Sequence, residues 1–197
     1  MKLLLPFFVV LFLALAGCKS SVSLEPITSV TNPSWNGNKP YEVMVIGFAY
    51  NPENRIEFED RVTAMLRSKG VSARQSYEVY PALQMLTVPV MDAYLASSPD
   101  AAILLGHAVA MTRDEKHSGK RSSTTELMAG SNRIDWEVEI GALLESALYV
   151  SESPTAVWVD RTRLHVGSDV GASALNTYVT YLSAALKRGE IIQRLKE

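Results

Sequence analysis

The first half of the chain alternates short apolar runs with amphipathic segments. Val43 to Ile46 is an unbroken apolar run, typical of a strand buried on both faces. Asn51 and Pro52 then mark the start of a helix, as N-cap and first helical residue, and Gly70 is expected to end it. The apolar stripe of this helix consists of Phe58, Val62, Met65 and Leu66. Charged residues take much of its remaining surface: Arg55, Glu57, Glu59, Asp60, Arg61 and Arg67.

Further strands are predicted over residues 71–77 and 101–106, with a short helix over residues 88–95 between them. An order of strand, helix, strand, helix, strand predicts parallel pairing with right-handed crossovers. The chain therefore begins its folded part as a β-α-β-α-β unit.

The pattern changes to a period of two from Ile134 to Val150, where even positions are mostly apolar and the first odd positions are acidic. Seventeen residues exceed the usual strand length, so we expect a bend or bulge near Gly141. The turn at residues 151–154 is short, and it predicts an antiparallel hairpin with a strand over residues 156–166. A final helix is predicted over residues 169–188, with Gly189 closing it. The predicted fold class is α/β, a two-layer or three-layer sandwich around a mixed sheet.

The first eighteen residues have the pattern of a secretory signal. Lys2 supplies a positive start, residues 3–16 carry no charge, and the segment ends in Leu15-Ala16-Gly17-Cys18. Fourteen uncharged residues are short for a membrane span, which needs about 20. The ending resembles the lipobox of bacterial lipoproteins. That resemblance implies cleavage before Cys18 and lipid on this cysteine, which is the only one in the chain. Lys19 in the next position implies the outer membrane, on its periplasmic face.

Residues 18–40 are rich in Ser, Thr, Asn and Pro, which predicts a flexible tether between the lipidated cysteine and the folded part. Trp35 is the exception, with two alternatives: it docks back on the domain, or it lies at the membrane interface. Residues 41–197 are then expected to form a single periplasmic domain. Without the leader, 18 basic side chains face 21 acidic ones, and this balance argues against nucleic acid as a partner.

The candidates for chemistry are few. The turn at residues 47–54 has one glycine, a proline and Glu53, which argues against a phosphate site. Asp135, Glu137 and Glu139 share a strand face but are about 7 Å apart in succession, so we expect a solvated face, where Arg161 and Arg163 of the next strand are candidates to pair with them. His107, His117 and His165 have no zinc spacing, and no Gly-x-Ser-x-Gly elbow occurs. We therefore expect no catalytic residue, no metal and no cofactor.

One polar segment stands out, from Thr112 to Arg133. Polar connections of this length are uncommon inside a compact domain and are usually functional or disordered. Two hypotheses are open: a mobile excursion, or a loop that contacts a partner. Its basic residues are the candidates for such a contact: Arg113, Lys116, Lys120 and Arg121.

The body of the chain resembles uncharacterised periplasmic lipoproteins with a compact α/β domain. The resemblance lies in the strand from Val43 to Phe48, in the helix and strand that follow it, and in Trp158 before the terminal helix. The chain is also distantly similar to the amino-terminal domain of TolB-like proteins and to the curli secretion lipoprotein. These families imply envelope assembly and protein contacts. The leading hypothesis is a non-enzymatic, outer-membrane adaptor or accessory subunit with an envelope protein as partner. The alternatives are a protein that binds a small periplasmic or cell-wall ligand, and an unrecognised hydrolase.

Overall fold

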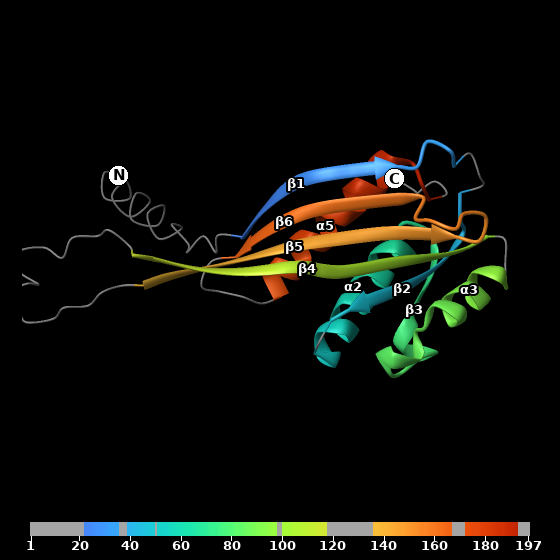
Figure 1. Ribbon diagram of the computed structural model, residues 1–197, viewed down its shortest axis with the longest axis horizontal. Helices are drawn as coiled ribbons and strands as arrows, with labels where there is room; N and C mark the ends of the chain where they lie inside the picture. Colours follow the sequence, from blue (N-terminus) through green and yellow to red (C-terminus); the bar gives the residue numbers. More distant parts are fainter. Residues whose placement is uncertain are drawn as a thin grey trace, which may run out of the picture.

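The fold is built around one mixed six-stranded sheet, as a computed structural model shows (Figure 1). The structure describes residues 22–35, 39–49, 51–97, 100–117, 136–166 and 172–192. The strands are β1 (Val22–Thr31), β2 (Glu42–Phe48), β3 (Ser72–Gln75), β4 (Ala101–His117), β5 (Trp136–Val150) and β6 (Trp158–Val166). The helices are α2 (Pro52–Ser68), α3 (Val88–Ala96) and α5 (Ala172–Gly189), with short 3-10 turns η1 (Ser76–Glu78) and η2 (Leu83–Met85).

The strand order is β1-β6-β5-β4-β2-β3. β2 pairs in parallel with both β3 and β4, which confirms the predicted β-α-β-α-β start. β4, β5 and β6 pair antiparallel, which confirms the predicted hairpin. The α/β class with a mixed sheet and a C-terminal helix is therefore as expected.

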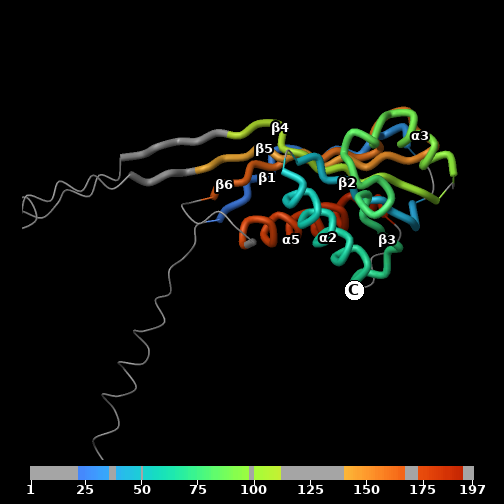
Figure 2. The backbone as a smooth tube through the Cα atoms, turned by 90° about the horizontal axis from the view of Figure 1, so that it is seen from below, coloured from blue at the N-terminus to red at the C-terminus, as the bar shows by residue number. Residues whose placement is uncertain are grey.

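The helices lie on both sides of the sheet, but unevenly (Figure 2). α2 and α5 cover one face, while α3 lies on the other face over β2 and β4. The sandwich thus has three layers where α3 lies and two layers over β5, β6 and β1 in the described part of the chain.

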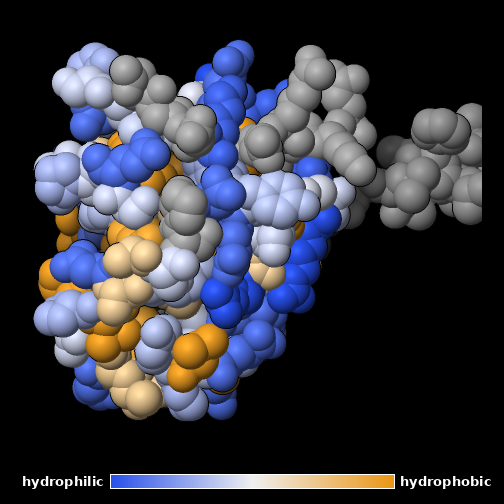
Figure 3. All heavy atoms as spheres, turned by 90° about the vertical axis from the view of Figure 1, so that its right-hand side faces the viewer, coloured by the Kyte–Doolittle hydropathy of each residue, from blue (hydrophilic) through white to orange (hydrophobic). Residues whose placement is uncertain are grey.

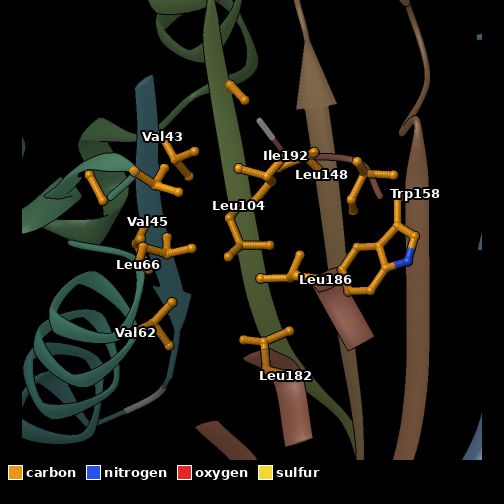
Figure 4. Close-up of a cluster of buried hydrophobic side chains, with 14 of the residues drawn as sticks. Val43, Val45, Val62, Leu66, Leu104, Leu148, Trp158, Leu182, Leu186 and Ile192 are labelled. Carbon is orange, nitrogen blue, oxygen red and sulfur yellow. The ribbon is translucent and has the colours of Figure 1, made fainter. Parts of the chain in front are cut away.

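The main core fills the space between the sheet and α2 and α5 (Figure 4). Val62 and Leu66 of the predicted α2 stripe are fully buried there, and Leu182 and Leu186 reach it from α5. Trp158 opens β6 and is only 1% exposed. The ends of α2 are as predicted: the Asn51 side chain accepts a hydrogen bond from the N–H of Glu53, and Gly70 takes a φ of 84° after the last turn.

Trp35 packs against this core, so the first of the two alternatives for this residue is confirmed. The prediction of a flexible tether is wrong for residues 22–31. They form β1, which pairs antiparallel with β6 from Val22 opposite Val166 to Thr31 opposite Trp158. Backbone hydrogen bonds to an existing strand order this polar segment, although it buries little apolar surface.

The predicted bulge near Gly141 is also wrong. Gly141 pairs regularly with Thr112 and with His165. The irregularity is on β4, where Ala108 pairs with Leu144 and Ala110 with Leu143, so that Val109 is the additional residue. It lies just beyond the point where β2 ends beside β4.

Two adjacent glycines make room for an aromatic ring between the sheet and α2. Gly47 of β2 pairs with Gly106 of β4, and the ring of Phe58 lies across both. A Cβ at Gly47 would lie 2.8 Å from Phe58 Cδ1, and one at Gly106 would overlap the ring. Phe58 also stacks on Tyr178 of α5 with ring centroids 6.3 Å apart. This contact links α2 to α5.

Replacing Gly106 by alanine is expected to lower the free energy of unfolding by about 1–3 kcal/mol, because the added methyl group displaces the Phe58 ring. Urea denaturation of G106A measures this cost. Adding Phe58→Leu to G106A should cost less than the sum of the two single changes, since the smaller side chain leaves room for the methyl group. Strict additivity would contradict this account of the glycine pair.

Candidate functional site

The predicted partner loop divides into a strand and an undescribed part. Residues 112–117 belong to β4, so the prediction of a loop is wrong for them. Arg113 pairs with Ile140 of β5, and Lys116 pairs with Glu137. The other two basic candidates, Lys120 and Arg121, lie outside the described residues, as does Cys18. Residues 112–117 are polar, yet their backbone pairs with β5 as a strand.

β4 and β5 extend beyond the rest of the sheet as a two-stranded arm. Ile140 is the last β5 residue with a partner on β6, but β4 and β5 remain paired from there to His117 and Trp136 (Figure 1). Exposed apolar side chains stand on β4 at the root of this arm: Val109 is 49% exposed and Met111 is 73% exposed. A projecting strand pair with apolar side chains at its root is a suitable shape for contact with another molecule.

The root of the arm is at the same end of the domain as the start of β1. One row of paired residues crosses the sheet there, Val22 to Val166, Val166 to Ile140, and Ile140 to Arg113. Val22 is only four residues after Cys18. Four residues span at most about 14 Å. A lipid on Cys18 would therefore hold this end of the domain, and the arm with it, near the membrane.

Charged side chains cross the sheet face that α3 leaves uncovered. Arg161 of β6 pairs with Glu145 of β5 at 2.5 Å, and Arg163 pairs with Glu25 of β1 at 3.0 Å. The register places the two arginines opposite Glu145 and Leu143, whereas Asp135 lies outside the described residues and Glu137 and Glu139 belong to the part of β5 beyond Ile140, which β6 does not reach. Exposed pairs of this kind contribute about 0–1 kcal/mol each. They make this part of the face hydrophilic.

The most concentrated polar cluster lies where α/β folds usually bind ligands, at the carboxyl ends of β2 and β3. Arg55 is 3% exposed and Glu59 is fully buried. The Arg55 guanidinium donates to Glu59 Oε1 at 2.8 Å, to Ser76 Oγ at 2.8 Å, and to the carbonyls of Tyr80 at 3.0 Å and Pro81 at 3.2 Å. Both side chains are therefore buried, although they lie outside the predicted apolar stripe of α2.

The carboxylate of Glu59 takes the place that an anionic ligand would need. It accepts from the N–H of Gly47 at 3.0 Å, from the N–H of Tyr77 at 3.0 Å and from Ser76 Oγ at 2.8 Å, besides Arg55. The N–H of Gly47 lies at the turn from β2 to α2, where a nucleotide-binding fold would hold phosphate. The side chains of this chain itself therefore occupy that position.

Sequence reasoning missed this cluster, although one signal was present. Arg55 and Glu59 are four residues apart, the spacing of an ion pair on a helix. They extend toward the end of β2, where the N–H of Gly47 donates to Glu59. Next to them, Tyr77 donates to Asp60 at 2.6 Å, and this hydrogen bond raises the pKa of Tyr77 to about 12.

A second buried acid lies between β6 and α5. Asp160 is 2% exposed and accepts a hydrogen bond from Tyr181 of α5 at 3.2 Å. Burial raises its pKa above the ordinary value of 3.8, and the hydrogen bonds from Tyr181 and Ser29 partly oppose the rise. Nearby, Ser146 and Tyr178 share a hydrogen bond of 2.6 Å, and burial raises the pKa of Tyr178. These groups form polar contacts between α5 and the strands β5 and β6.

Asp160→Asn is expected to remove a pH dependence of stability. With its pKa raised by burial, the folded protein binds a proton at Asp160 over a pH range where the unfolded chain has lost it. Stability therefore falls as the pH rises from about 4 through the folded-state pKa. The free energy of unfolding of D160N minus that of the wild type should increase over this pH range and then level off. Urea denaturation from pH 4 to pH 7 measures it, with Glu57→Gln on the exposed side of α2 as control. A difference that does not change with pH would contradict the assignment.

Among the described residues, the histidines and the acidic residues form no metal site. His107 lies on β4 opposite Phe48 and Glu145, and His165 lies on β6 at 3.8 Å from Glu25. Within the described ranges, no three His, Cys, Asp or Glu side chains are placed to hold a metal ion. His117 is the last residue of β4. The helices that the structure describes include none long and apolar enough for a membrane span.

A second group of exposed apolar side chains lies away from the arm, on the segment that leads into α3. Val79 is 46% exposed, Met85 is 48% exposed and Val88 is 64% exposed. The view from this end of the molecule shows apolar residues gathered on one side and hydrophilic residues on the other (Figure 3). These three residues form an exposed apolar surface away from the arm, with which the arm can be compared.

No family model and no curated protein matches the chain. Among solved structures, it is similar to the PelC dodecamer from Paraburkholderia phytofirmans, at 13% identity and a TM-score of 0.45 over 88% of this chain and all of that one. It is also similar to lipoprotein GNA1162 from Neisseria meningitidis, at 10% identity and a TM-score of 0.44 over 76% of this chain and 99% of that one. A minor lipoprotein from Acinetobacter baumannii shares 7% identity at a TM-score of 0.40, over 77% and 96% of the two chains. All three scores are below 0.5, so any function of this chain must follow from its own residues.

Proposed function

We propose that this protein is a non-catalytic lipoprotein of the bacterial envelope, held by lipid on Cys18 to the outer membrane on its periplasmic face. It acts as an adaptor or accessory subunit of an envelope complex, and the β4–β5 arm reaches the partner. The observation that carries this proposal is the row from Val22 to Arg113, which places the start of β1, four residues after Cys18, and the root of the arm at one end of the domain.

The physical advantage of this arrangement is a high effective concentration. A domain confined near a membrane meets a neighbouring partner far more often than a free domain does, because the second contact becomes intramolecular. With three residues between Cys18 and β1, the arm root stays in a thin layer beside the membrane. Partners embedded in or bound to the same membrane are favoured by this geometry.

The buried cluster at the carboxyl ends of β2 and β3 favours an adaptor over a ligand-binding protein or a hydrolase. In those functions, polar groups converge on a space that a ligand enters. Here Glu59 accepts four hydrogen bonds from its own chain, and Arg55 donates to two side chains and two backbone carbonyls. Groups satisfied in this way stabilise the fold.

Cross-linking the full-length protein in its native envelope tests the proposal, with Cys18→Ser as the mislocalised control. We expect a discrete, reproducible partner that is captured only when Cys18 is intact. Equal capture by Cys18→Ser would show that the anchor is not needed. No partner with either protein would favour the alternative of a small periplasmic or cell-wall ligand.

A further inference from the structure

β1 is packed against the domain much less firmly than the other long strands. Eight of its ten residues are exposed, and Val22 and Leu24 are only half-buried. These two side chains pack on a small cluster of Leu164, Val166 and Ala174, separate from the main core. The strand is therefore held chiefly by its backbone pairing with β6.

That pairing is itself interrupted. The register shifts between Pro26 and Thr28, so Ile27 is an additional residue, and it is 42% exposed. Pro26 has no N–H to donate to β6. A bulge and a proline in the middle of an edge strand reduce the number of regular hydrogen bonds that hold it.

Few side-chain contacts add to the pairing. Glu25 reaches Arg163 at 3.0 Å and His165 at 3.8 Å, but both are exposed enough for water to weaken the attraction. Side-chain hydrogen bonds also join the strands: Trp158 donates to Ser29 Oγ at 3.2 Å, Thr162 donates to the carbonyl of Glu25 at 3.0 Å, and Ser29 donates to the carboxylate of Asp160.

The chain directly after β1 is held much more firmly. Asn32 donates its N–H to the carbonyl of Val157 at 2.8 Å, and Trp35 packs against the main core. β6 in turn stays paired with β5 from Val166 to Trp158 and keeps the buried Trp158 in the core. Separation of β1 from β6 would thus stop at Asn32 and leave the core intact.

We propose that β1 is a releasable strap that separates from β6 as a unit, from Val22 to Asn32. Combined with the proposed anchor at Cys18, release lengthens the link to the membrane from four residues to fourteen, or from about 14 Å to about 48 Å when extended. Release also moves the point at which the tether joins the folded domain. This point shifts by the length of the ten-residue strand, about 33 Å, to the opposite end of the sheet. The docked strap holds the arm root at the membrane, and the released strap lets the domain turn and reach farther.

Amide hydrogen exchange of the full-length protein in vesicles of phosphatidylethanolamine and phosphatidylglycerol tests the release. Local opening predicts that β1 amides exchange at least about 100-fold faster than those of β5. Glu25→Lys puts like charges beside Arg163 and should speed β1 exchange about tenfold, with β5 unchanged. Glu57→Lys is the matched control, because it breaks an exposed pair with Arg61 on α2. Equal exchange of β1 and β5, or equal acceleration of both by Glu25→Lys, would overturn the proposal.

Energy transfer to dye-labelled lipids tests the change of attachment. A dye on Ser173→Cys reports the end where β1 starts, since the adjacent Ala174 packs in the same cluster as Val22. A dye on Glu152→Cys reports the opposite end, just after β5. We expect stronger transfer from position 173 in the otherwise wild-type protein, and a smaller difference between the sites when Glu25→Lys is added. An undiminished difference with Glu25→Lys would contradict the change of attachment.

The two tests separate the strap from the anchor. In a Cys18→Ser background, transfer to lipid should be lost at both sites while β1 exchange is unchanged. If transfer is absent with Cys18 intact, the proposed anchoring fails, and the exchange experiment still decides whether the strap opens. If transfer is present and β1 exchanges as slowly as β5, the anchor stands and the strap is wrong.

Discussion

Replacing Glu59 by glutamine should lower the free energy of unfolding by about 3–5 kcal/mol, the usual cost of breaking a buried ion pair from one side. The change keeps the size of the side chain but removes its charge. Arg55 is 3% exposed and would keep a positive charge with no carboxylate beside it. The N–H groups of Gly47 and Tyr77 donate to different oxygens of Glu59, so the amide nitrogen of glutamine would present donors to one of them. The loss falls on a contact set that joins β2, α2 and the η1 turn.

Urea denaturation of E59Q measures this loss, and Glu57→Gln is the matched control. Glu57 also pairs with an arginine four residues away, Arg61, but this pair lies on the exposed side of α2. Its loss should cost no more than about 0.5 kcal/mol. Replacing Arg55 by methionine together with Glu59 by leucine should cost less than E59Q alone, since no charge is then left buried. Similar results for E59Q and E57Q would mean that the cluster does not hold the fold.

Trimming the arm should abolish capture of the partner and leave the domain folded. The variant removes residues 114–139 and joins Arg113 to Ile140 through Asn-Gly, a two-residue hairpin turn that suits directly opposed residues. The row from Val22 to Arg113 is kept, so the anchored end of the sheet is unchanged. We expect at least a tenfold loss of cross-linked partner and a melting temperature within a few degrees of the wild type, because the deleted strands extend beyond the row.

The basic candidates are tested by a second variant with the arm intact, in which Arg113, Lys116, Lys120 and Arg121 are all replaced by glutamine. If charge carries the contact, this variant loses the partner as fully as the trimmed one. If shape and the apolar root carry it, only the trimmed variant does. Full capture by the trimmed protein would contradict the role of the arm.

The parts of the fold that the sequence predicted are those whose apolar periodicity is set by the main core. Val43 to Ile46 and the stripe of α2 are buried where expected. The β5–β6 hairpin and the C-terminal helix follow from alternation and from the spacing of Leu182 and Leu186. In each case burial of the side chains determines the element, so the pattern is visible in the residues themselves.

The parts that were missed depend on contacts which side-chain polarity does not encode. β1 is ordered by pairing with β6, and its exposed Ser, Thr and Pro residues have the composition of a tether. The continuation of β4 through His117 has the composition of a loop for the same reason. Arg55 and Glu59 look like surface charges until the N–H groups of Gly47 and Tyr77 beside them are known. The bulge at Val109 depends on where β2 stops, which is a property of the neighbouring strand.

The most direct test of the central claim is site-specific photo-cross-linking in living cells from the root of the arm. A photoreactive residue at Met111, which is 73% exposed, is compared with one at Val88, which is 64% exposed and lies at the start of α3. The adaptor account predicts one discrete cross-linked species from position 111 that disappears with Cys18→Ser, and none of it from position 88. The same species from position 88, or no species from position 111 while Cys18 is intact, would contradict the account.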